Sequence, residues 1–240
     1  MSEVTGYEVD DRGVAVMRLQ RPGSRNAIDT QMLLEMLEHI AVARADDDVR
    51  VLVISSSDHM GLSAGADVKE ELDEEGKVRR MQLFADLYDA IVAFPKPTIA
   101  ACHGDVVGGG AEIAVACDMR VGGSNLRMRF PGVALRVPVG PARLVTLCGL
   151  AAAKYLLLSS RTVGADEALR LGLVSRVAPA AGTEEAALEL AAEVSAHPAE
   201  AVARLKRMLH EWDGVEGRSQ DEGVGQVEWQ RSGPGLPFVE

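Results

Sequence analysis

Leu62-Ser63-Ala64-Gly65-Ala66-Asp67 and His103-Gly104-Asp105-Val106-Val107-Gly108-Gly109-Gly110-Ala111-Glu112 are the two stretches that decide how this sequence is interpreted. The first follows a predicted strand and loop, and the second joins a predicted strand to a predicted helix. Glycines in such turns let the backbone approach a ligand and point its N–H groups at it. Two N–H groups converging on one oxygen atom would form an oxyanion hole. A glycine triplet is also typical of a turn that only packs tightly.

Other classes of ligand fit the sequence poorly. The glycine-rich turn matches neither the G-x-x-x-x-G-K-[ST] phosphate loop nor the G-x-G-x-x-G dinucleotide motif. The chain has 240 residues and a net charge of −11, and such an acidic chain repels nucleic-acid backbones. An anionic small molecule is still compatible with this charge, because local arginines and helix N-termini can bind phosphates.

The hydrophobic pattern around these stretches alternates between strands and helices. Short apolar runs at residues 14–19, 51–55 and 98–102 predict strands. From Pro138 onward the pattern becomes helical, with predicted helices at residues 141–148, 151–158, 165–171, 183–196 and 199–212. Strands alternating with helices, followed by a run of helices, predict an α/β fold. We expect a core over residues 1–180 and a helical region with a polar tail over residues 181–240.

Several features bear on the cellular context. The three cysteines have no C-x-x-C spacing, so we expect free thiols in a reducing compartment: Cys102, Cys117 and Cys148. We expect no apolar run to reach transmembrane length, and the acidic N-terminus is unlike a signal peptide. These features predict a soluble cytoplasmic protein with no membrane partner. The glycine-rich tail after Gly214 is expected to be partly disordered.

From about Val14 to Met208, separated motifs in one order resemble the crotonase (enoyl-CoA hydratase/isomerase) family. The motifs are Arg21-Pro22, Arg25-Asn26-Ala27, Ser63-Ala64-Gly65-Ala66-Asp67, Lys96-Pro97-Thr98-Ile99-Ala100-Ala101, Gly108-Gly109-Gly110-Ala111-Glu112, Cys117-Asp118, Ala168, Gly172-Leu173-Val174 and Lys206. The resemblance implies a crotonase-like ββα-spiral core with a C-terminal helical trimerisation region. It also implies a homotrimer or a hexamer, and Leu188, Leu190, Leu205 and Leu209 are candidate interface residues.

The resemblance implies roles for individual residues. The backbone N–H groups of Ala66 and Gly109 would hold a thioester oxygen. The other residues expected to bind substrate or coenzyme A are Arg25, Ala27, Ala64, Asp67, Gly108, Gly110 and Lys206. The side chain of Asp67 itself looks structural, and Arg25 and Lys206 are also compatible with ordinary surface charges.

Glu112 matches the first of two catalytic glutamates of enoyl-CoA hydratases. A glutamate in the first helical turn also favours the helix dipole without any catalytic role. The second glutamate of hydratases follows a proline, and that dipeptide matches Pro131-Gly132 here. Hydration uses one carboxylate toward water and another toward the α-carbon, so Gly132 leaves one of these groups missing. Typical isomerases use the same second position.

No other residue is a clear substitute for the second glutamate. Arg136 and Arg143 lie just downstream and could bind a carboxylate or phosphate instead. For Asp118 we favour a structural role, and a lone histidine such as His103 is more often a packing or hydrogen-bonding residue than a base.

The sequence therefore predicts an enzyme that binds an acyl-CoA thioester and stabilises an enolate-like intermediate, as an enoyl-CoA hydratase or isomerase does. The alternatives are an acyl-CoA decarboxylase or hydrolase of the same superfamily, or a non-catalytic acyl-CoA-binding subunit. No metal or redox cofactor is expected, because no cluster of His, Cys or Asp has ligand spacing.

Overall fold

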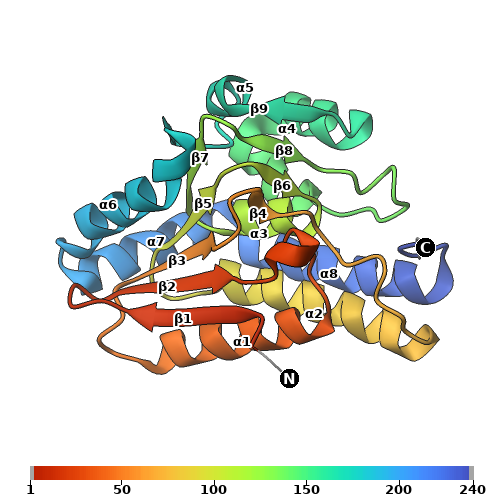
Figure 1. The fold of residues 1–240 in the computed structure, drawn as a ribbon, viewed down its shortest axis with the longest axis horizontal. Coiled ribbons are helices and arrows are strands. Elements are labelled where there is room, and N and C mark those ends of the chain that lie inside the picture. Colours follow the sequence, from red (N-terminus) through yellow and green to blue (C-terminus); the bar gives the residue numbers. More distant parts are fainter. Residues whose placement is uncertain (1–2, 238–240) are drawn as a thin grey trace.

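The computed structural model describes residues 3–237, which form two β-sheets and the helices around them (Figure 1). The larger sheet has six strands in the order β1-β2-β3-β5-β7-β10, and the smaller has four in the order β4-β6-β8-β9. The strands are β1 (Thr5–Val9), β2 (Val14–Leu19), β3 (Val51–Ser56), β4 (Gly61–Ser63), β5 (Thr98–Cys102), β6 (Asp105–Val107), β7 (Met119–Gly123), β8 (Arg127–Arg129), β9 (Thr162–Gly164) and β10 (Arg176–Ala178).

Helices connect and cover the strands. The α-helices are α1 (Thr30–Ala45), α2 (Glu74–Val92), α3 (Gly109–Ala116), α4 (Pro141–Ser159), α5 (Ala165–Arg170), α6 (Thr183–Ser195), α7 (Ala199–Asp213) and α8 (Val215–Ser232), with short 3₁₀ turns η1 (Pro22–Ser24) and η2 (Ala180–Gly182). Asp29 and Asp73 cap α1 and α2, because their side chains accept hydrogen bonds from the Met32 and Gly76 N–H groups.

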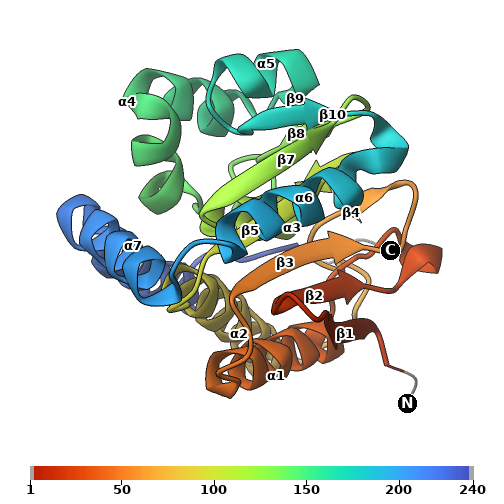
Figure 2. The ribbon, with the colours of Figure 1, turned by 90° about the vertical axis from the view of Figure 1, so that its left-hand side faces the viewer.

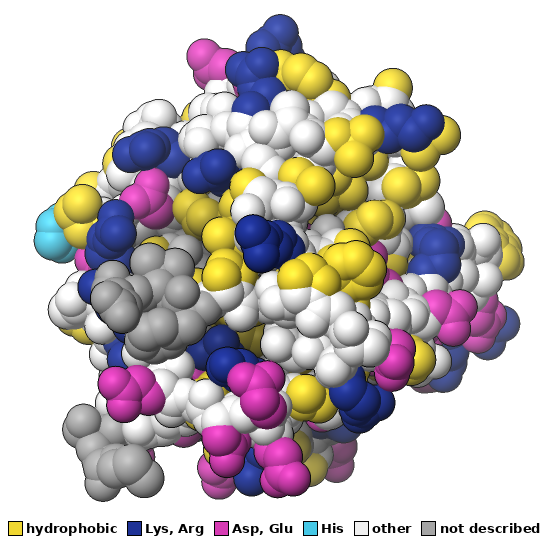
Figure 3. All heavy atoms as spheres, turned by 90° about the vertical axis from the view of Figure 1, so that its right-hand side faces the viewer, with side chains coloured by type: hydrophobic (Ala, Val, Ile, Leu, Met, Phe, Trp, Pro, Cys, Tyr) yellow, Lys and Arg dark blue, Asp and Glu magenta, His cyan; other side chains and the backbone are white. Residues whose placement is uncertain are grey.

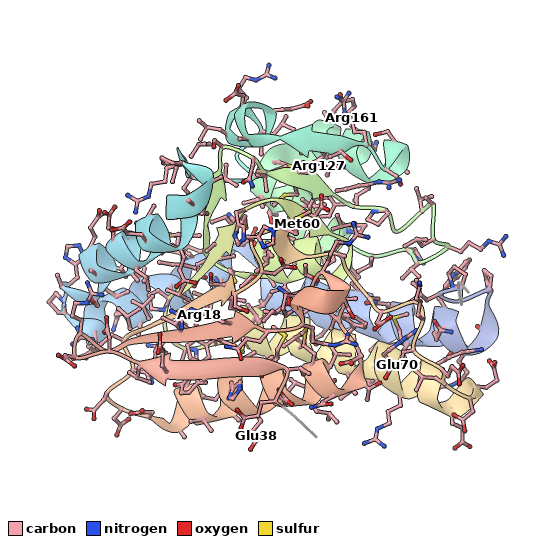
Figure 4. All side chains as sticks on the ribbon, viewed as in Figure 1. Arg18, Glu38, Met60, Glu70, Arg127 and Arg161 are labelled. Atoms are coloured by element: carbon pink, nitrogen blue, oxygen red, sulfur yellow. The ribbon has the colours of Figure 1, made fainter. Side chains whose placement is uncertain are left out.

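The larger sheet is buried on both faces, which explains its continuous apolar runs. From β2 through β3, β5, β7 and β10 the strands are parallel, and only β1 pairs antiparallel with β2. Met17 and Ile54 face the main core, while their neighbours Val16 and Val53 face the opposite side, where α6 packs (Figure 2). Arg18, labelled in Figure 4, anchors α6 by donating hydrogen bonds to the Glu184 carboxylate.

The smaller sheet positions the two glycine-containing stretches. β4 and β6 are parallel neighbours, with Gly61 opposite Asp105 and Ser63 opposite Val106. The carboxyl ends of parallel strands lie at the same edge of a sheet. The turn after β4 and the turn between β6 and α3 therefore meet, although they lie far apart in the sequence.

The C-terminal tail corrects one expectation. After Gly214, which has φ 71°, the chain does not become irregular but forms α8, which packs along α2 (Figure 1). The contact is close because it uses small residues: a Cβ added to Gly223 would lie 3.0 Å from the Ala85 Cβ. One of the glycines that suggested disorder, Gly223, thus allows close helix packing at this position.

Helix α4 modifies two other expectations. The two helices predicted at residues 141–148 and 151–158 are present, but they join at a kink at Gly149, with φ 80° and ψ 156°. Contrary to the sequence expectation, α4 is long and apolar enough to cross a membrane by length and composition alone. In this fold α4 packs against α3 and α8.

The four candidate interface leucines fall into two groups. Leu188 and Leu190 on α6 are half-buried against the sheet. Leu205 and Leu209 on α7 are exposed, and so is Trp212 one turn further on. In Figure 2, α7 extends away from the sheets at the left of the molecule.

Candidate functional site

A cavity of about 210 Å³ lies where the two glycine-containing turns meet. Ala64, Gly65 and Ala66 line it from the turn after β4, and Val107, Gly108 and Gly109 line it from the turn before α3. The remaining lining residues come from α2, α3, α8 and three irregular segments: Val68, Met81, Phe84, Tyr88, Glu112, Phe130, Pro131, Gly132, Leu135, Val137, Val139, Gln226 and Leu236.

The N–H groups of Ala66 and Gly109 are free to bind a ligand. Ile28 pairs with the residues on either side of Ala66, because its N–H donates to the Gly65 carbonyl and its carbonyl accepts from the Asp67 N–H. The Ala66 N–H therefore faces away from Ile28. Gly109 begins α3, where an N–H has no intrahelical acceptor. Within residues 3–237, neither N–H donates a hydrogen bond.

Each glycine around these N–H groups is required for a structural reason of its own. Gly65 has φ 96°, and a Cβ there would lie 2.8 Å from the Val107 carbonyl oxygen and 3.5 Å from the Gly109 nitrogen. Gly108 has φ 52°, in the region that side chains disfavour. A Cβ on Gly109 would meet the Phe84 ring at 2.9 Å, and one on Gly110 would meet the Ser63 Cβ at 2.7 Å. The triplet thus packs tightly and also forms the wall of the cavity.

Glu112 lines this cavity, with 2% of the residue exposed. Its Oε2 atom accepts a hydrogen bond of 3.1 Å from Arg143 Nη2. The pKa of Glu112 is raised to about 7, mainly by burial and also by the carboxylate of Glu222, while Arg143 opposes the rise. A carboxyl group with a pKa near neutrality can both accept and donate a proton at physiological pH.

A buried ion network surrounds Glu112, and sequence reasoning missed it. Arg143 Nη2 also donates to Glu222 Oε1 at 2.5 Å, and Arg143 Nη1 donates to Ser219 Oγ at 3.0 Å. Both partners come from α8. No spacing rule predicts contacts between residues 76 to 79 positions apart. The only signal was that Arg143 is a charged residue in an otherwise apolar helix.

The part of the cavity wall formed by residues 130–139 is apolar. Residues 131–139 form a turn in which the Val137 N–H donates to the Gly132 carbonyl at 2.8 Å. A Cβ on Gly132 would lie 2.5 Å from the Val137 carbonyl oxygen, so this turn has no room for a side chain there. Among the lining residues of the described chain, Glu112 is the one carboxylate.

The segment at residues 25–27 lies beside the cavity but does not line it. The Arg25 carbonyl accepts from the Ala64 N–H at 2.9 Å, which holds the two segments together. The Arg25 side chain is exposed, 3.8 Å from Asp105, and the Ala27 carbonyl accepts from Arg21. Asn26 was not singled out, yet its buried side chain connects the segment to Ser56 at 2.6 Å.

The structure gives Asp67, Asp118 and His103 structural partners. The Asp67 carboxylate accepts a hydrogen bond of 3.0 Å from Arg21. Arg80 donates to the Asp67 backbone carbonyl and to the carboxylate of Glu70, which is labelled in Figure 4. His103 Nε2 lies 2.7 Å from the Asp58 carbonyl oxygen.

Lys206 lies away from the cavity. It is 9% exposed, and its ammonium donates to Asp118 at 2.7 Å and to the Lys96 carbonyl at 3.0 Å. These bonds attach α7 to the core. The role in coenzyme A binding that the resemblance implies for Lys206 stays a prediction, since its ammonium already has these two partners within the protein.

The positions of Arg143 and Arg136 bear on whether either could bind a carboxylate or phosphate of a ligand. Arg143 already contacts two glutamates, so it is not available to bind a carboxylate of a ligand. Arg136 is exposed and belongs to a second, apolar groove of about 650 Å³ between the 131–139 turn, α4 and α8. This groove shares Val137 and Val139 with the cavity. Figure 3 shows hydrophobic side chains gathered from the middle of this face toward α4 at the upper right.

The three cysteines have no disulfide partner, as expected. Burial raises the pKa of the Cys102 and Cys117 thiols to about 12, so both thiols are protonated near neutral pH.

Comparison with known proteins identifies the family. Residues 10–222 match the family model described as enoyl-CoA hydratase/isomerase. The chain is 32% identical to the 2,3-dehydroadipyl-CoA hydratase of Escherichia coli K12 over 201 residues, which is 82% of this chain and 78% of that protein. It is 35% identical to a putative enoyl-CoA hydratase of Thermus thermophilus over 84% of this chain and 82% of that protein.

Solved structures agree with this result. An enoyl-CoA hydratase/isomerase from Xanthobacter autotrophicus Py2 superimposes with a TM-score of 0.88 at 26% identity, over 99% of this chain and 90% of that chain. The chain therefore belongs to the enoyl-CoA hydratase/isomerase family, whose members act on acyl-CoA. The predicted α/β crotonase fold with C-terminal helices is confirmed.

Proposed function

We propose that this enzyme holds the thioester carbonyl of an acyl-CoA between the N–H groups of Ala66 and Gly109, with Glu112 as its acid–base group. The observation that carries the proposal is the meeting of two unpaired N–H donors and one buried carboxylate at a single cavity. Donors fixed in advance stabilise the negative charge that develops on the oxygen of an enolate.

Glu112 would transfer a proton at the carbon chain next to the thioester. As a base, it takes the proton from the α-carbon while the electron pair of the C–H bond moves into the enolate. The reverse step returns the proton to carbon. Its pKa of about 7 suits both directions.

One carboxylate is the distinguishing feature of the proposed mechanism. Hydration by two carboxylates needs a group toward water and a group toward the α-carbon. With Gly132 and an apolar turn in the cavity wall, Glu112 would have to perform both tasks or leave one to solvent. We therefore infer slow hydration and favour reactions that need a single proton-transfer group. No observation favours a decarboxylase, because no arginine lines the described cavity.

The apolar wall suggests where the acyl chain lies. Beyond Val137 and Val139, the groove of about 650 Å³ offers a mostly hydrophobic path toward α4 and Trp229. Burying each CH₂ group contributes about 0.8 kcal/mol. The substrate class we favour is thus an acyl-CoA with a chain longer than that of crotonyl-CoA.

We also propose that the protein forms a trimer or a dimer of trimers. The exposed apolar residues of α7 support an interface: Leu205, Leu209 and Trp212. Leu188 and Leu190 are poorer candidates, because they pack within their own chain. Light scattering at micromolar concentration that shows only monomer would contradict this proposal.

The function is tested by a turnover screen over enoyl-, malonyl- and hydroxyacyl-CoA thioesters of increasing chain length, with products identified by mass spectrometry. We expect products from enoyl substrates that disappear in Glu112→Gln, and higher kcat/KM for longer chains. Calorimetric binding without any turnover would instead support a binding subunit. Absence of both binding and turnover would refute the acyl-CoA assignment.

A further inference from the structure

The carboxylates of Glu222 and Glu112 both bind the guanidinium of Arg143. One guanidinium nitrogen, Arg143 Nη2, donates to Glu112 at 3.1 Å and to Glu222 at 2.5 Å. Because a single nitrogen serves both carboxylates, a change at Glu222 acts directly on the bond that Arg143 makes to Glu112.

Glu222 is itself fixed by the backbone. Its carboxylate accepts hydrogen bonds from the Gly140 N–H at 3.1 Å and the Ala142 N–H at 2.8 Å, which are free donors at the start of α4. A carboxylate at a helix N-terminus is favoured by the helix dipole. Gly140 also lies close to Glu112, because a Cβ added to Gly140 would be 2.8 Å from Glu112 Oε1.

The network is closed to solvent. Side-chain exposure is 2% for both Arg143 and Glu112, and 10% for Glu222. The guanidinium lies 4.9 Å from the centre of the Tyr88 ring, and Ser219 accepts from its other terminal nitrogen. Charges in such surroundings interact strongly, so that the removal of one partner affects the others.

We propose that Glu222 is a positioning residue for proton transfer by Glu112: by sharing Arg143, it fixes the Glu112 carboxylate and offsets the positive charge that the arginine would otherwise direct at it. This inference rests on the function proposed for Glu112. It gives α8, which follows the family motifs in the chain, a role in the chemistry of the cavity.

The direction of the effect follows from the charges around Glu112. Arg143 from α4 favours the ionised form of Glu112, whereas Glu222 from α8 and burial favour the neutral form. On α2, burial raises the pKa values of Tyr88 and Asp89, and Ser219 donates to Asp89. Loss of the negative charge of Glu222 leaves Arg143 to act on Glu112 alone, which lowers the pKa of Glu112.

The experiment compares Glu222→Gln with Glu228→Gln, a matched exposed glutamate on the same helix that pairs only with Arg231 among the described residues. In Glu222→Gln we expect kcat to fall about tenfold to a hundredfold with little change in KM, because the reacting group is displaced. The acid limb of the pH–kcat profile should move down by about one pH unit. Glu222→Asp keeps the charge, so its kcat and the position of its acid limb should lie between those of Glu222→Gln and the wild type. Glu228→Gln should match the wild type.

A direct titration separates this inference from the proposed function. NMR of ¹³C-labelled glutamate side chains, with Glu112 assigned through Glu112→Gln, measures the pKa of Glu112 without any turnover. A lowered pKa in Glu222→Gln supports the link, even for a protein that proves inactive on every thioester. An unchanged pKa together with an unchanged pH profile would overturn it. If Glu222→Gln fails to fold, a smaller shift in the same direction in Glu222→Asp supports the inference, and no shift overturns it.

Discussion

The two walls of the cavity differ in how they are built. The first wall consists of two glycine turns and the start of α3, and it includes Ala66, Gly109 and Glu112. The second wall is the apolar turn at residues 131–139, which excludes a side chain at Gly132. Under the function proposed above, the first wall would hold a thioester oxygen, and Glu112 would be the one carboxylate of the cavity lining that acts on the carbon chain.

Among substitutions in the first wall, we expect one at Glu112 to reduce turnover most. Glu112→Gln removes the proton-transfer group, so we expect turnover to fall about 10²–10⁴-fold. Binding of the substrate should change little, because the N–H donors are intact. Steady-state kinetics and calorimetry measure the two effects separately. Turnover that survives the substitution would show that another group carries the reaction.

The next largest effect in the first wall should be a loss of stability when Gly65 is replaced. Gly65→Ala places a Cβ 2.8 Å from the Val107 carbonyl oxygen at φ 96°. We expect a loss of about 1–3 kcal/mol in the free energy of unfolding. Denaturant unfolding measures it, with Gly23→Ala as the control, because a Cβ at Gly23 meets nothing within 4 Å. Equal stability of both variants would contradict the strained geometry at Gly65.

The second wall should resist conversion into a two-carboxylate site. Gly132→Glu would force a Cβ to within 2.5 Å of the Val137 carbonyl oxygen. We expect a destabilisation of about 1–3 kcal/mol and no gain in crotonyl-CoA hydration. Ala134→Glu, at an exposed position of the same turn, should have a stability and a hydration rate close to those of the wild type. Faster hydration by Gly132→Glu would show that this turn can aim a carboxylate inward.

The smallest expected effect is a pH dependence of stability caused by Glu112. Burial raises its pKa from 4.5 to about 7 in the folded state. Between these values the folded protein binds a proton that the unfolded chain has lost, so stability falls as pH rises through this window. Urea unfolding from about pH 5 to about pH 8 should show this fall in the wild type relative to Glu112→Gln. A relative rise would mean that Arg143 dominates the environment of Glu112.

The sequence predicted most of the first wall. The apolar runs indicated the strands, and the glycine motifs placed Ala66, Gly109 and Glu112 in turns that the structure brings together. Local patterns succeed here because a parallel strand pair brings its carboxyl ends to one edge of the sheet.

The remaining features depend on contacts that no local pattern contains. Helix α8 was expected to be partly disordered, because its glycines weaken a helix in isolation. In the structure one of them, Gly223, allows close contact with α2. Lys206 was assigned to coenzyme A, whereas a distant aspartate, Asp118, binds its ammonium. The pairing of Arg143 with Glu222 arises in the same way, from helices that meet only in the folded chain.

The claim that one carboxylate serves this cavity is tested most directly by crotonyl-CoA hydration. The loss of enone absorbance would be followed for this protein, for Glu112→Gln and for the 2,3-dehydroadipyl-CoA hydratase of Escherichia coli K12. That relative would first be verified to hydrate this substrate through two carboxylates. We predict that this protein is slower by about 10²–10⁴-fold and that Glu112→Gln removes what is left. Hydration as fast as that of the relative, retained in Glu112→Gln, would contradict the account.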